Sequence, residues 1–512
     1  MKEQIPPIMG WSSWNYFRQS IDEDKILAIA QAMKQSGLSK VGYEYINLDD
    51  CWHSSKRSQQ GELQFDLTNF PNGSRVIDEI HQLGLKVGLY SSCGVMTCED
   101  LPGSFGNEVV DANTFSQWNV DFLKYDYCHV VDLKSDEKWL IDSPYVVSLE
   151  FYNKKTKVRT HFGVETGQLS GKAQLNQEEI SFVSGLEKNQ GRVGFNACLS
   201  EGDYVVTVEY KKRATEKRQL LLLKLNQQEI VMYFPTSSGW SLTGREQVEI
   251  SLDTNVTSVE IFNPVKDQKS DAILRYKTMS MALEKAYVEQ IPIVFAICEH
   301  GRNEPWRWAQ SFAHQYRIDH DISNTWQSVV ACYEKAVTVS SYAVEGSYGD
   351  PDMLEVGNGV LTEIENQSHF SLWSFLSAPL ILGNDLRDFV NNGEKDMEIS
   401  NKALEILTNE AIIQFNQTRP YLPAYHQSFG SIDVLVKVLN DGTSGVLVFN
   451  KSEETKNVTL LLSELPSVIH GNPFIYQNQI VTEVWGKEYQ IREDMLEITD
   501  LAPHEVYVLQ FK

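Results

Sequence analysis

Two short apolar runs decide the fold: Lys86-Val87-Gly88-Leu89-Tyr90 and Phe122-Leu123-Lys124-Tyr125. A third run of the same kind, Tyr45-Ile46-Asn47-Leu48, comes before them. Helical patterns occupy residues 22–35, 73–83 and 111–118, and the first two have candidate N-caps in Asp22 and Asn72. Strands that alternate with helices are typical of βαβ units, so this part of the chain is predicted to form parallel strands.

The pattern changes twice along the rest of the chain. From about residue 143 to residue 264, short β-rich runs are separated by turn residues, as in a β-sandwich. A helical pattern at 272–288 and an apolar run at 291–296 then restore the alternation. After about residue 415 the chain is β-rich again.

These segments predict three domains. The two alternating segments, 1–132 and 271–415, together approach the roughly 250 residues of a (β/α)8 TIM barrel. We therefore predict an α/β fold in which a TIM barrel is interrupted after its fourth strand by an inserted β-sandwich at 133–270. A C-terminal antiparallel β-sandwich is predicted at 416–512.

Composition and charge exclude several classes of protein. The formal net charge is -24, and such a surface repels phosphate backbones, so no nucleic-acid partner is predicted. No stretch approaches the roughly 18 apolar residues of a membrane span, so no membrane partner is predicted either. Residues 1–9 lack the apolar core of a signal peptide, which predicts a cytoplasmic protein or one whose leader has been removed. The sequence leaves open whether the chain forms a homo-oligomer.

The predicted strands end in polar residues, and in TIM-barrel enzymes the active site lies at these ends. Carboxylates accept hydrogen bonds from vicinal hydroxyls, and aromatic rings stack on the C–H face of a sugar. Two carboxylates can also flank a glycosidic bond. The strand ends therefore predict a sugar site built from Trp14, Asp49, Asp50, Tyr90, Lys124, Asp126, Cys298, Glu299, Arg317, Asp321 and Asp352.

Within this set, Lys124 and Asp126 lie two residues apart on one strand and therefore share a face. The ammonium of Lys124 is expected to keep Asp126 ionised. Metal chemistry is weakly supported, because the sequence has no His-x-His or His-Glu-x-x-His pattern. A Gly-rich phosphate loop is also missing from the late barrel. We predict no cofactor and no metal.

Several motifs resemble glycoside hydrolase family 27, the α-galactosidase and α-N-acetylgalactosaminidase family. They follow one another in the family's order across both halves of the barrel. They are Met9-Gly10-Trp11-Ser12-Ser13-Trp14, Asn47-Leu48-Asp49-Asp50-Cys51-Trp52, Lys124-Tyr125-Asp126, Arg317-x-x-x-Asp321, the run from Asp350 to Gly359, His369-Phe370-Ser371-Leu372-Trp373 and the run from Ala378 to Asp385.

The resemblance implies a role for each position. Asp126 would be the nucleophile and Asp321 the general acid/base of a retaining exo-glycosidase. That enzyme would remove terminal α-D-galactose from oligosaccharides or glycoconjugates. The remaining positions would bind the sugar: Asp49, Asp50 and Trp14 at the 4- and 6-hydroxyls, Lys124 beside the nucleophile, Cys298, Glu299 and Arg317 near the 2-position, and Tyr90 and Asp352 along the pocket. The family also implies a disulfide between Cys98 and Cys128.

Three departures from the family pattern surround this site. His300 stands where Trp is usual, Tyr127 where Asn or Gly is usual, and Gly346-Ser347-Tyr348-Gly349 where Gly-Gly-Trp-Asn is usual. They leave open whether the glycone is galactose, N-acetylgalactosamine or β-L-arabinopyranose. A carbohydrate-binding protein without activity is an alternative of another class. It is disfavoured because both aspartates of the catalytic pair are present.

Structural roles compete with the functional ones at several positions. Asp49 and Asp50 could cap a helix, Glu299 could be an ion-pair partner, and Asp319 lies close enough to Asp321 to be confused with it. The insert looks like a carbohydrate-binding module in two places, Val164 to Gly171 and Ser238-Gly239-Trp240.

Overall fold

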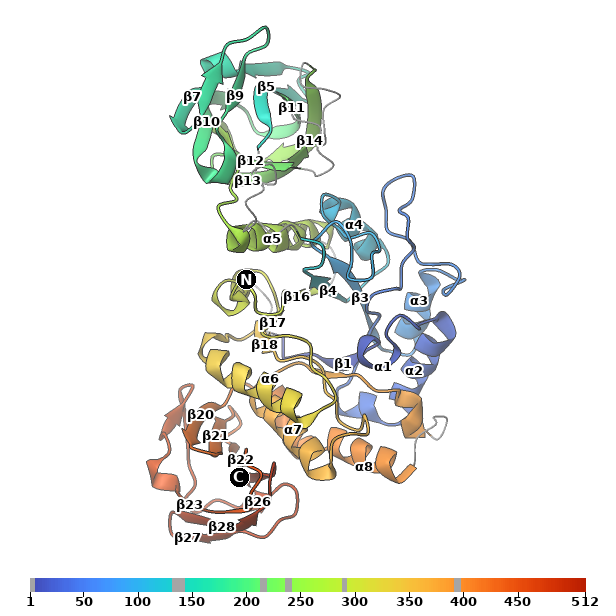
Figure 1. Cartoon of the computed structure of the whole chain (residues 1–512), viewed down its shortest axis with the longest axis vertical. Coiled ribbons are helices and arrows are strands. Elements are labelled where there is room, and N and C mark those ends of the chain that lie inside the picture. Colours follow the sequence, from blue (N-terminus) through green and yellow to red (C-terminus); the bar gives the residue numbers. More distant parts are fainter. Residues whose placement is uncertain (1–4, 131–142, 212–218, 235–241, 288–291, 391–396) are drawn as a thin grey trace. The chain divides into compact units, whose positions relative to one another are not determined.

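The computed structural model describes residues 5–130, 143–211, 219–234, 242–287, 292–390 and 397–512. The chain divides into two compact units, Met1–His129 with Met279–Lys512, and Val130–Thr278. The first unit holds a barrel and a C-terminal sandwich, and the second holds the insert (Figure 1). The predicted boundary at residue 132 and the segment Ser238-Gly239-Trp240, which resembles a carbohydrate-binding module, lie outside the described residues.

The barrel is an eight-stranded parallel sheet in the order β18-β17-β16-β4-β3-β2-β1-β19. A parallel bridge between Leu354, just after β18, and Leu382, in β19, joins the two ends of this sheet. The strands are β1 (Met9–Ser12), β2 (Tyr45–Asn47), β3 (Lys86–Ser92), β4 (Phe122–Asp126), β16 (Val294–Cys298), β17 (Gln315–Arg317), β18 (Tyr348–Asp350) and β19 (Leu380–Leu382). The prediction of a barrel interrupted after its fourth strand is confirmed, because β4 and β16 are paired neighbours.

Helices alternate with these strands as the sequence predicted. They are α1 (Trp14–Phe17), α2 (Glu23–Gln35), α3 (Arg75–Gln82), α4 (Glu108–Gln117), α5 (Gln268–Ala286), α6 (Trp326–Val339), α7 (Glu363–Phe375), α8 (Met397–Leu407) and α9 (Glu410–Gln417). Asp22 caps α2 by accepting a hydrogen bond from the Lys25 backbone N–H. Asn72 does not cap α3, which was a wrong prediction: the cap position is Ser74, and Asn72 donates to Glu23 instead.

The barrel interior is apolar at its base. The half-buried side chain of Trp14 packs against a cluster of buried side chains there. The buried members of the cluster are Ile8, Tyr45, Phe122, Val294, Ala296, Met353 and Ile381. The polar residues follow at the carboxyl ends of the same strands. This arrangement is the usual one in TIM barrels, where the packed core supports a polar site above it.

The insert is a β-sandwich. One sheet has the order β13-β12-β15-β10-β7 and the other β14-β11-β5-β9-β8, with β6 paired to β5. The strands are β5 (Tyr145–Asn153), β6 (Arg159–Gly163), β7 (Gln168–Gly171), β8 (Gln174–Asn176), β9 (Phe182–Ser184), β10 (Gly191–Leu199), β11 (Gly202–Lys211), β12 (Gln219–Leu225), β13 (Gln228–Phe234), β14 (Gly244–Leu252) and β15 (Val256–Phe262). Inward-facing residues of β11, such as Val206 and Val208, are fully buried in one core.

The C-terminal domain is also built from antiparallel strands around a core of its own. One sheet contains β20 (Tyr425–Phe429), β21 (Ile432–Val438), β22 (Ser444–Asn450), β29 (Val506–Phe511) and β26 (Val481–Glu483). A second contains β23 (Lys456–Leu461), β28 (Met495–Leu501) and β27 (Gln490–Arg492), and β24 (Val468–Ile469) pairs with β25 (Asn472–Pro473).

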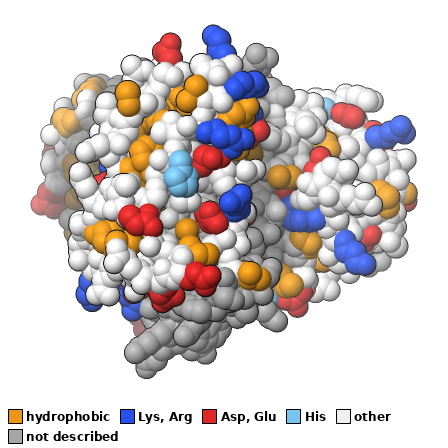
Figure 2. All heavy atoms as spheres, turned by 90° about the horizontal axis from the view of Figure 1, so that it is seen from above, with side chains coloured by type: hydrophobic (Ala, Val, Ile, Leu, Met, Phe, Trp, Pro, Cys, Tyr) orange, Lys and Arg blue, Asp and Glu red, His pale blue; other side chains and the backbone are white. Residues whose placement is uncertain are grey.

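Within the described residues, none of the helices combines the length and the apolar character needed to cross a membrane. On the face shown in Figure 2, acidic, basic and hydrophobic side chains are interspersed.

Candidate active site

Asp126, the last residue of β4, lies at the centre of the site. Its side chain is almost completely buried. Oδ1 accepts a hydrogen bond of 2.7 Å from the Tyr127 backbone N–H, and Oδ2 accepts one of 3.2 Å from the Tyr90 hydroxyl at the end of β3. Two donors thus fix the orientation of a buried carboxylate, as a positioned nucleophile requires.

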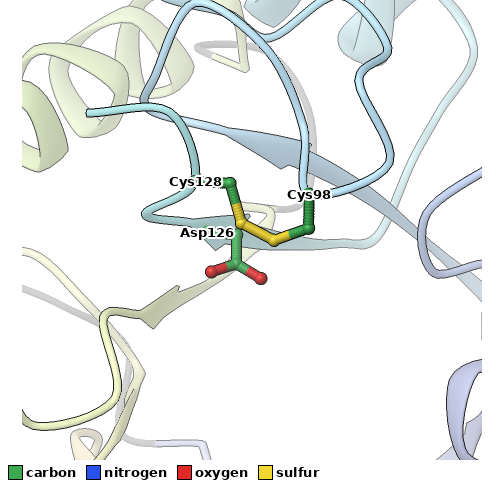
Figure 3. Close-up of side chains that lie close together, drawn as sticks. All are labelled: Cys98, Asp126 and Cys128. Atoms are coloured by element: carbon green, nitrogen blue, oxygen red, sulfur yellow. A yellow bond between two sulfur atoms is a disulfide. The ribbon is translucent and has the colours of Figure 1, made fainter. Parts of the chain in front are cut away.

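A disulfide between Cys98 and Cys128 lies beside this carboxylate (Figure 3). It links the loop after β3 to the loop after β4, and the Tyr90 hydroxyl is 3.4 Å from Cys98 Sγ. The two loops also pack closely, since a Cβ at Gly94 would lie 1.8 Å from the Cys128 carbonyl oxygen. The bond therefore restrains the loops that follow Tyr90 on β3 and Asp126 on β4.

Arg317, on β17, organises the opposite side of the site. One guanidinium nitrogen, Nη2, lies 3.0 Å from Asp321 Oδ1 and 2.9 Å from Asp352 Oδ2. Asp352 also accepts from the Ile322 backbone N–H, which fixes the segment that carries Asp321. Burial opposes ionisation of Asp321, but the charges of Arg317, Lys124 and His300 and the hydrogen bond from Arg317 together outweigh it and lower the pKa of Asp321 to about 2.

His300 lies between the two aspartates predicted to be catalytic. Its Nε2 is 3.5 Å from Asp321 Oδ1 and 4.0 Å from Asp126 Oδ1. The two Oδ1 atoms can therefore be no more than 7.5 Å apart, the sum of these distances. Retaining glycosidases place their carboxyl groups roughly 5–5.5 Å apart, and inverting ones roughly 6.5–9.5 Å. A separation of these two oxygens within 7.5 Å is compatible with the retaining range.

From the sequence, His300 was identified only as a departure from the family pattern and was not predicted to be a site residue. Burial lowers the pKa of its imidazole. Its backbone is in the left-handed region, with φ 57°, and Asp352 shares this feature with φ 81°. Such backbone conformations in residues other than glycine often occur at functional sites.

A second acidic pair follows β2. Lys124 Nζ forms an ion pair of 2.8 Å with Asp49 Oδ2, so its ammonium is directed to Asp49 and not to Asp126. Burial alone would lower the pKa of Lys124, but the charges of Asp49 and Asp126 hold it well above its usual value. Burial raises the pKa of Asp50 to about 6, and its oxygens accept from the backbone N–H groups of Cys51 and Glu99.

Glu299 and Trp14 have contacts outside this cluster. The Glu299 carboxylate is fully buried and accepts from both the backbone N–H and the side-chain amide of Asn303, at 2.8 and 2.6 Å. This contact favours the structural role that the sequence left open for Glu299. The ring of Trp14 packs against the barrel interior and has the Arg18 guanidinium 5.4 Å from its centroid.

A cavity of about 40 Å³ lies in the barrel, in contact with several of the predicted site residues. Its polar lining includes Asp49, Lys124, Cys298, Arg317 and Asp352, and its apolar lining includes buried barrel residues. Ligand pockets usually have about 300 Å³ or more, so this cavity is too small to hold a sugar by itself. Arg317 Nε is buried and has no acceptor among the described residues, which leaves it available to a ligand or water.

Together these contacts suit hydrolysis of a glycosidic bond. A buried, oriented carboxylate faces a second carboxylate whose side chain is 59% exposed and can exchange protons with water. Carboxylates and cations on neighbouring strands supply hydrogen-bonding groups for sugar hydroxyls.

Comparison with known proteins agrees with this geometry. The family model described as alpha galactosidase A matches residues 6–149 and 255–418, and the model described as the alpha galactosidase C-terminal beta sandwich domain matches 429–511. The first of these models thus matches the chain in two parts. The residues between those parts, 150–254, belong to the inserted sandwich.

Individual relatives cover almost the whole chain. Alpha-galactosidase A of Cellvibrio japonicus is 28% identical over 98% of this chain and 91% of its own. The crystal structure of alpha-galactosidase I from Mortierella vinacea superimposes with a TM-score of 0.64 at 23% identity, over 99% of this chain and 97% of that one. The crystal structure of a β-L-arabinopyranosidase from Geobacillus stearothermophilus superimposes with a TM-score of 0.60 at 16% identity, over 99% of this chain and 96% of that one. These two structural likenesses concern the fold alone.

Proposed function

The chain belongs to the α-galactosidase family, glycoside hydrolase family 27, and we propose that it removes terminal α-linked galactose from galactosides with retention of configuration. The observation that carries the proposal is the placement of Asp126 and Asp321 around His300 Nε2. Two carboxyl groups within this distance can flank one glycosidic bond.

We assign the chemistry as a double displacement. The Asp126 carboxylate attacks the anomeric carbon while the Asp321 carboxyl gives its proton to the leaving oxygen. The bond to the aglycone breaks and a galactosyl ester of Asp126 forms. Asp321, now ionised, takes a proton from water, which attacks the anomeric carbon and releases Asp126.

The other polar residues are proposed to hold the sugar. Lys124 and Asp49, as a buried ion pair, offer a donor and an acceptor to neighbouring hydroxyls. Tyr90 orients the nucleophile, and Arg317 and Asp352 hold the segment that carries Asp321. The proposed substrates are small galactosyl oligosaccharides and galactosyl glycoconjugates.

The test is hydrolysis of p-nitrophenyl α-galactoside, α-N-acetylgalactosaminide and β-L-arabinopyranoside by the wild type and by Asp126→Ala. Turnover of the galactoside alone, abolished by the substitution, is the expected result. Proton NMR of the first product formed should show the α-anomer, as retention requires.

Other outcomes separate the alternatives. Faster turnover of either other glycoside would reassign the glycone while keeping the reaction. If none of the three is hydrolysed but galactose still binds, the chain is a carbohydrate-binding protein and the proposal fails.

A further inference from the structure

Three side chains that commonly bind metals meet at the proposed nucleophile. Asp126, Cys298 and His300 each offer one ligand atom, and these atoms all lie within 4.8 Å of one another. Oxygen, thiolate sulfur and imidazole nitrogen are the ligands of zinc in proteins. We propose that this trio is an inhibitory site for Zn²⁺ and similar thiophilic divalent cations, which block the nucleophile reversibly.

The fold aligns the three ligands. Cys298 and Asp126 are direct register partners on the paired strands β16 and β4, so their side chains leave the sheet at the same level. His300 follows two residues later on a tight turn, in which Gly301 has φ 70° and a Cβ at that glycine would lie 2.2 Å from the Ile318 carbonyl oxygen. The Glu299–Asn303 hydrogen bonds close this turn.

The spacing needs only a small contraction around an ion. Tetrahedral zinc with Zn–N near 2.0 Å and Zn–S near 2.3 Å separates its ligand atoms by roughly 3.3–3.8 Å. Nε2 of His300 is 4.0 Å from Asp126 Oδ1. It is also 3.5 Å from Asp321 Oδ1, so a second carboxylate adds negative charge beside the trio without belonging to it.

The charges around the trio permit a cation. Three carboxylates surround the trio or belong to it, those of Asp126, Asp321 and Asp352. Their negative charges outnumber the positive charges of the two neighbouring cations, Arg317 and Lys124. On binding, the metal–sulfur bond replaces the S–H bond of Cys298, and the proton passes to solvent. Arg317 Nη1 lies 3.7 Å from Cys298 Sγ and can donate to the sulfur that carries the added negative charge.

Binding can be measured without any enzyme assay. Cd²⁺ is titrated into the chelator-treated, unreduced protein, and the ultraviolet thiolate-to-Cd²⁺ charge-transfer band is recorded. The wild type should reach saturation at one equivalent, and Zn²⁺ should displace the band. Cys298→Ala should abolish the band, and His300→Phe and His300→Gln should each weaken Cd²⁺ binding by roughly 10-fold or more.

The matched control is Cys198→Ser, which removes an exposed cysteine of the insert and should leave the band unchanged. Thermal melting of each variant shows whether it is folded. A band of full size in Cys298→Ala, or unchanged affinity in both His300 variants, would overturn the site.

The inhibitory effect rests on the proposed function and is tested separately. Zn²⁺ should raise KM for p-nitrophenyl α-galactoside without lowering kcat, and EDTA should restore the original KM. His300→Phe should need about 10-fold more Zn²⁺ for the same effect. Absence of the Cd²⁺ band from an active wild-type protein refutes the metal site alone, whereas a normal band in a wild-type protein that hydrolyses no galactoside refutes the proposed function alone. If Zn²⁺ binds but leaves KM unchanged, the inhibitory assignment is wrong.

Discussion

Asp321 has to satisfy two opposite requirements as a general acid. It must carry a proton when the glycosidic bond breaks, yet Arg317, Lys124 and His300 together lower the pKa of its carboxyl to about 2 in the free protein. Its side chain is 59% exposed, so water also stabilises the ionised form. A bound sugar would displace that water, and the loss of solvation raises the pKa of the carboxyl toward the working range.

The role of Asp321 predicts a dependence on the leaving group. In Asp321→Ala, kcat/KM for a galactosyl disaccharide should fall by about 10³-fold, within the usual range for loss of an acid/base catalyst. For p-nitrophenyl α-galactoside the first step should be far less affected, since p-nitrophenolate leaves without a proton. Stopped-flow detection of a p-nitrophenol burst, followed by slow turnover, is the measurement.

Asp319 provides the control for this prediction. It lies two residues away, and its Oδ1 accepts from the His320 backbone N–H. Asp319→Ala should keep kcat/KM for both substrates within a few-fold of the wild type. If Asp319→Ala shows the burst and Asp321→Ala does not, the acid/base has been assigned to the wrong aspartate.

At the scale of elements, the turn after β16 determines where two site residues lie. Cys298 ends the strand, His300 faces both aspartates, and the buried Glu299 between them is bound at both carboxylate oxygens by Asn303. We propose that Glu299 acts as a positioning residue for this turn.

This role predicts the effect of Asn303→Ala. The substitution removes the side-chain donor from a buried carboxylate, which should lower the free energy of unfolding by about 1–3 kcal/mol. Chemical denaturation measures that loss, and kcat for the galactoside should fall with it as Cys298 and His300 shift. Should the variant unfold like the wild type while KM alone rises, Glu299 would be a substrate contact, as first predicted.

The same comparison shows what the sequence can and cannot predict. The strand-end residues could be assigned because parallel strands bring their carboxyl ends to one edge of the sheet, whatever the loops do. The contact of His300 with both aspartates depends on the positive φ angles at 300 and 301, and no sequence pattern predicted it. Asn72 was misread as a cap because α3 begins only at Arg75, after Ser74, and the side-chain amide of Asn72 instead donates to Glu23, 49 residues earlier.

At the scale of the whole molecule, the barrel and the C-terminal sandwich form one compact unit. Buried polar contacts cross between them, including a hydrogen bond of 2.9 Å from the Tyr333 hydroxyl to Asp433 Oδ2. Lys437 of β21 is fully buried at this junction. Its Nζ donates to Ser377 Oγ at 2.6 Å and lies 3.4 Å from the carbonyl oxygens of Ser374 and Phe375, at the end of α7.

The burial of Lys437 predicts how the stability of this unit depends on pH. Burial lowers the pKa of its ammonium to about 7, whereas the unfolded chain has a pKa of about 10.4. Between these values the unfolded state binds more protons, so the contribution of Lys437 to stability rises with pH, by up to about 1.4 kcal/mol per unit. Lys437→Met lacks this slope. Its melting temperature relative to the wild type should therefore be highest near pH 7 and should fall steadily toward pH 10, as measured by calorimetry in buffers of matched ionic strength.

Lys456→Met, at a partly exposed lysine paired with Glu454 on the same sandwich, should show a constant difference over that range. A constant difference for Lys437→Met as well would mean that its amine stays charged inside the junction, held by the carbonyl oxygens at the end of α7.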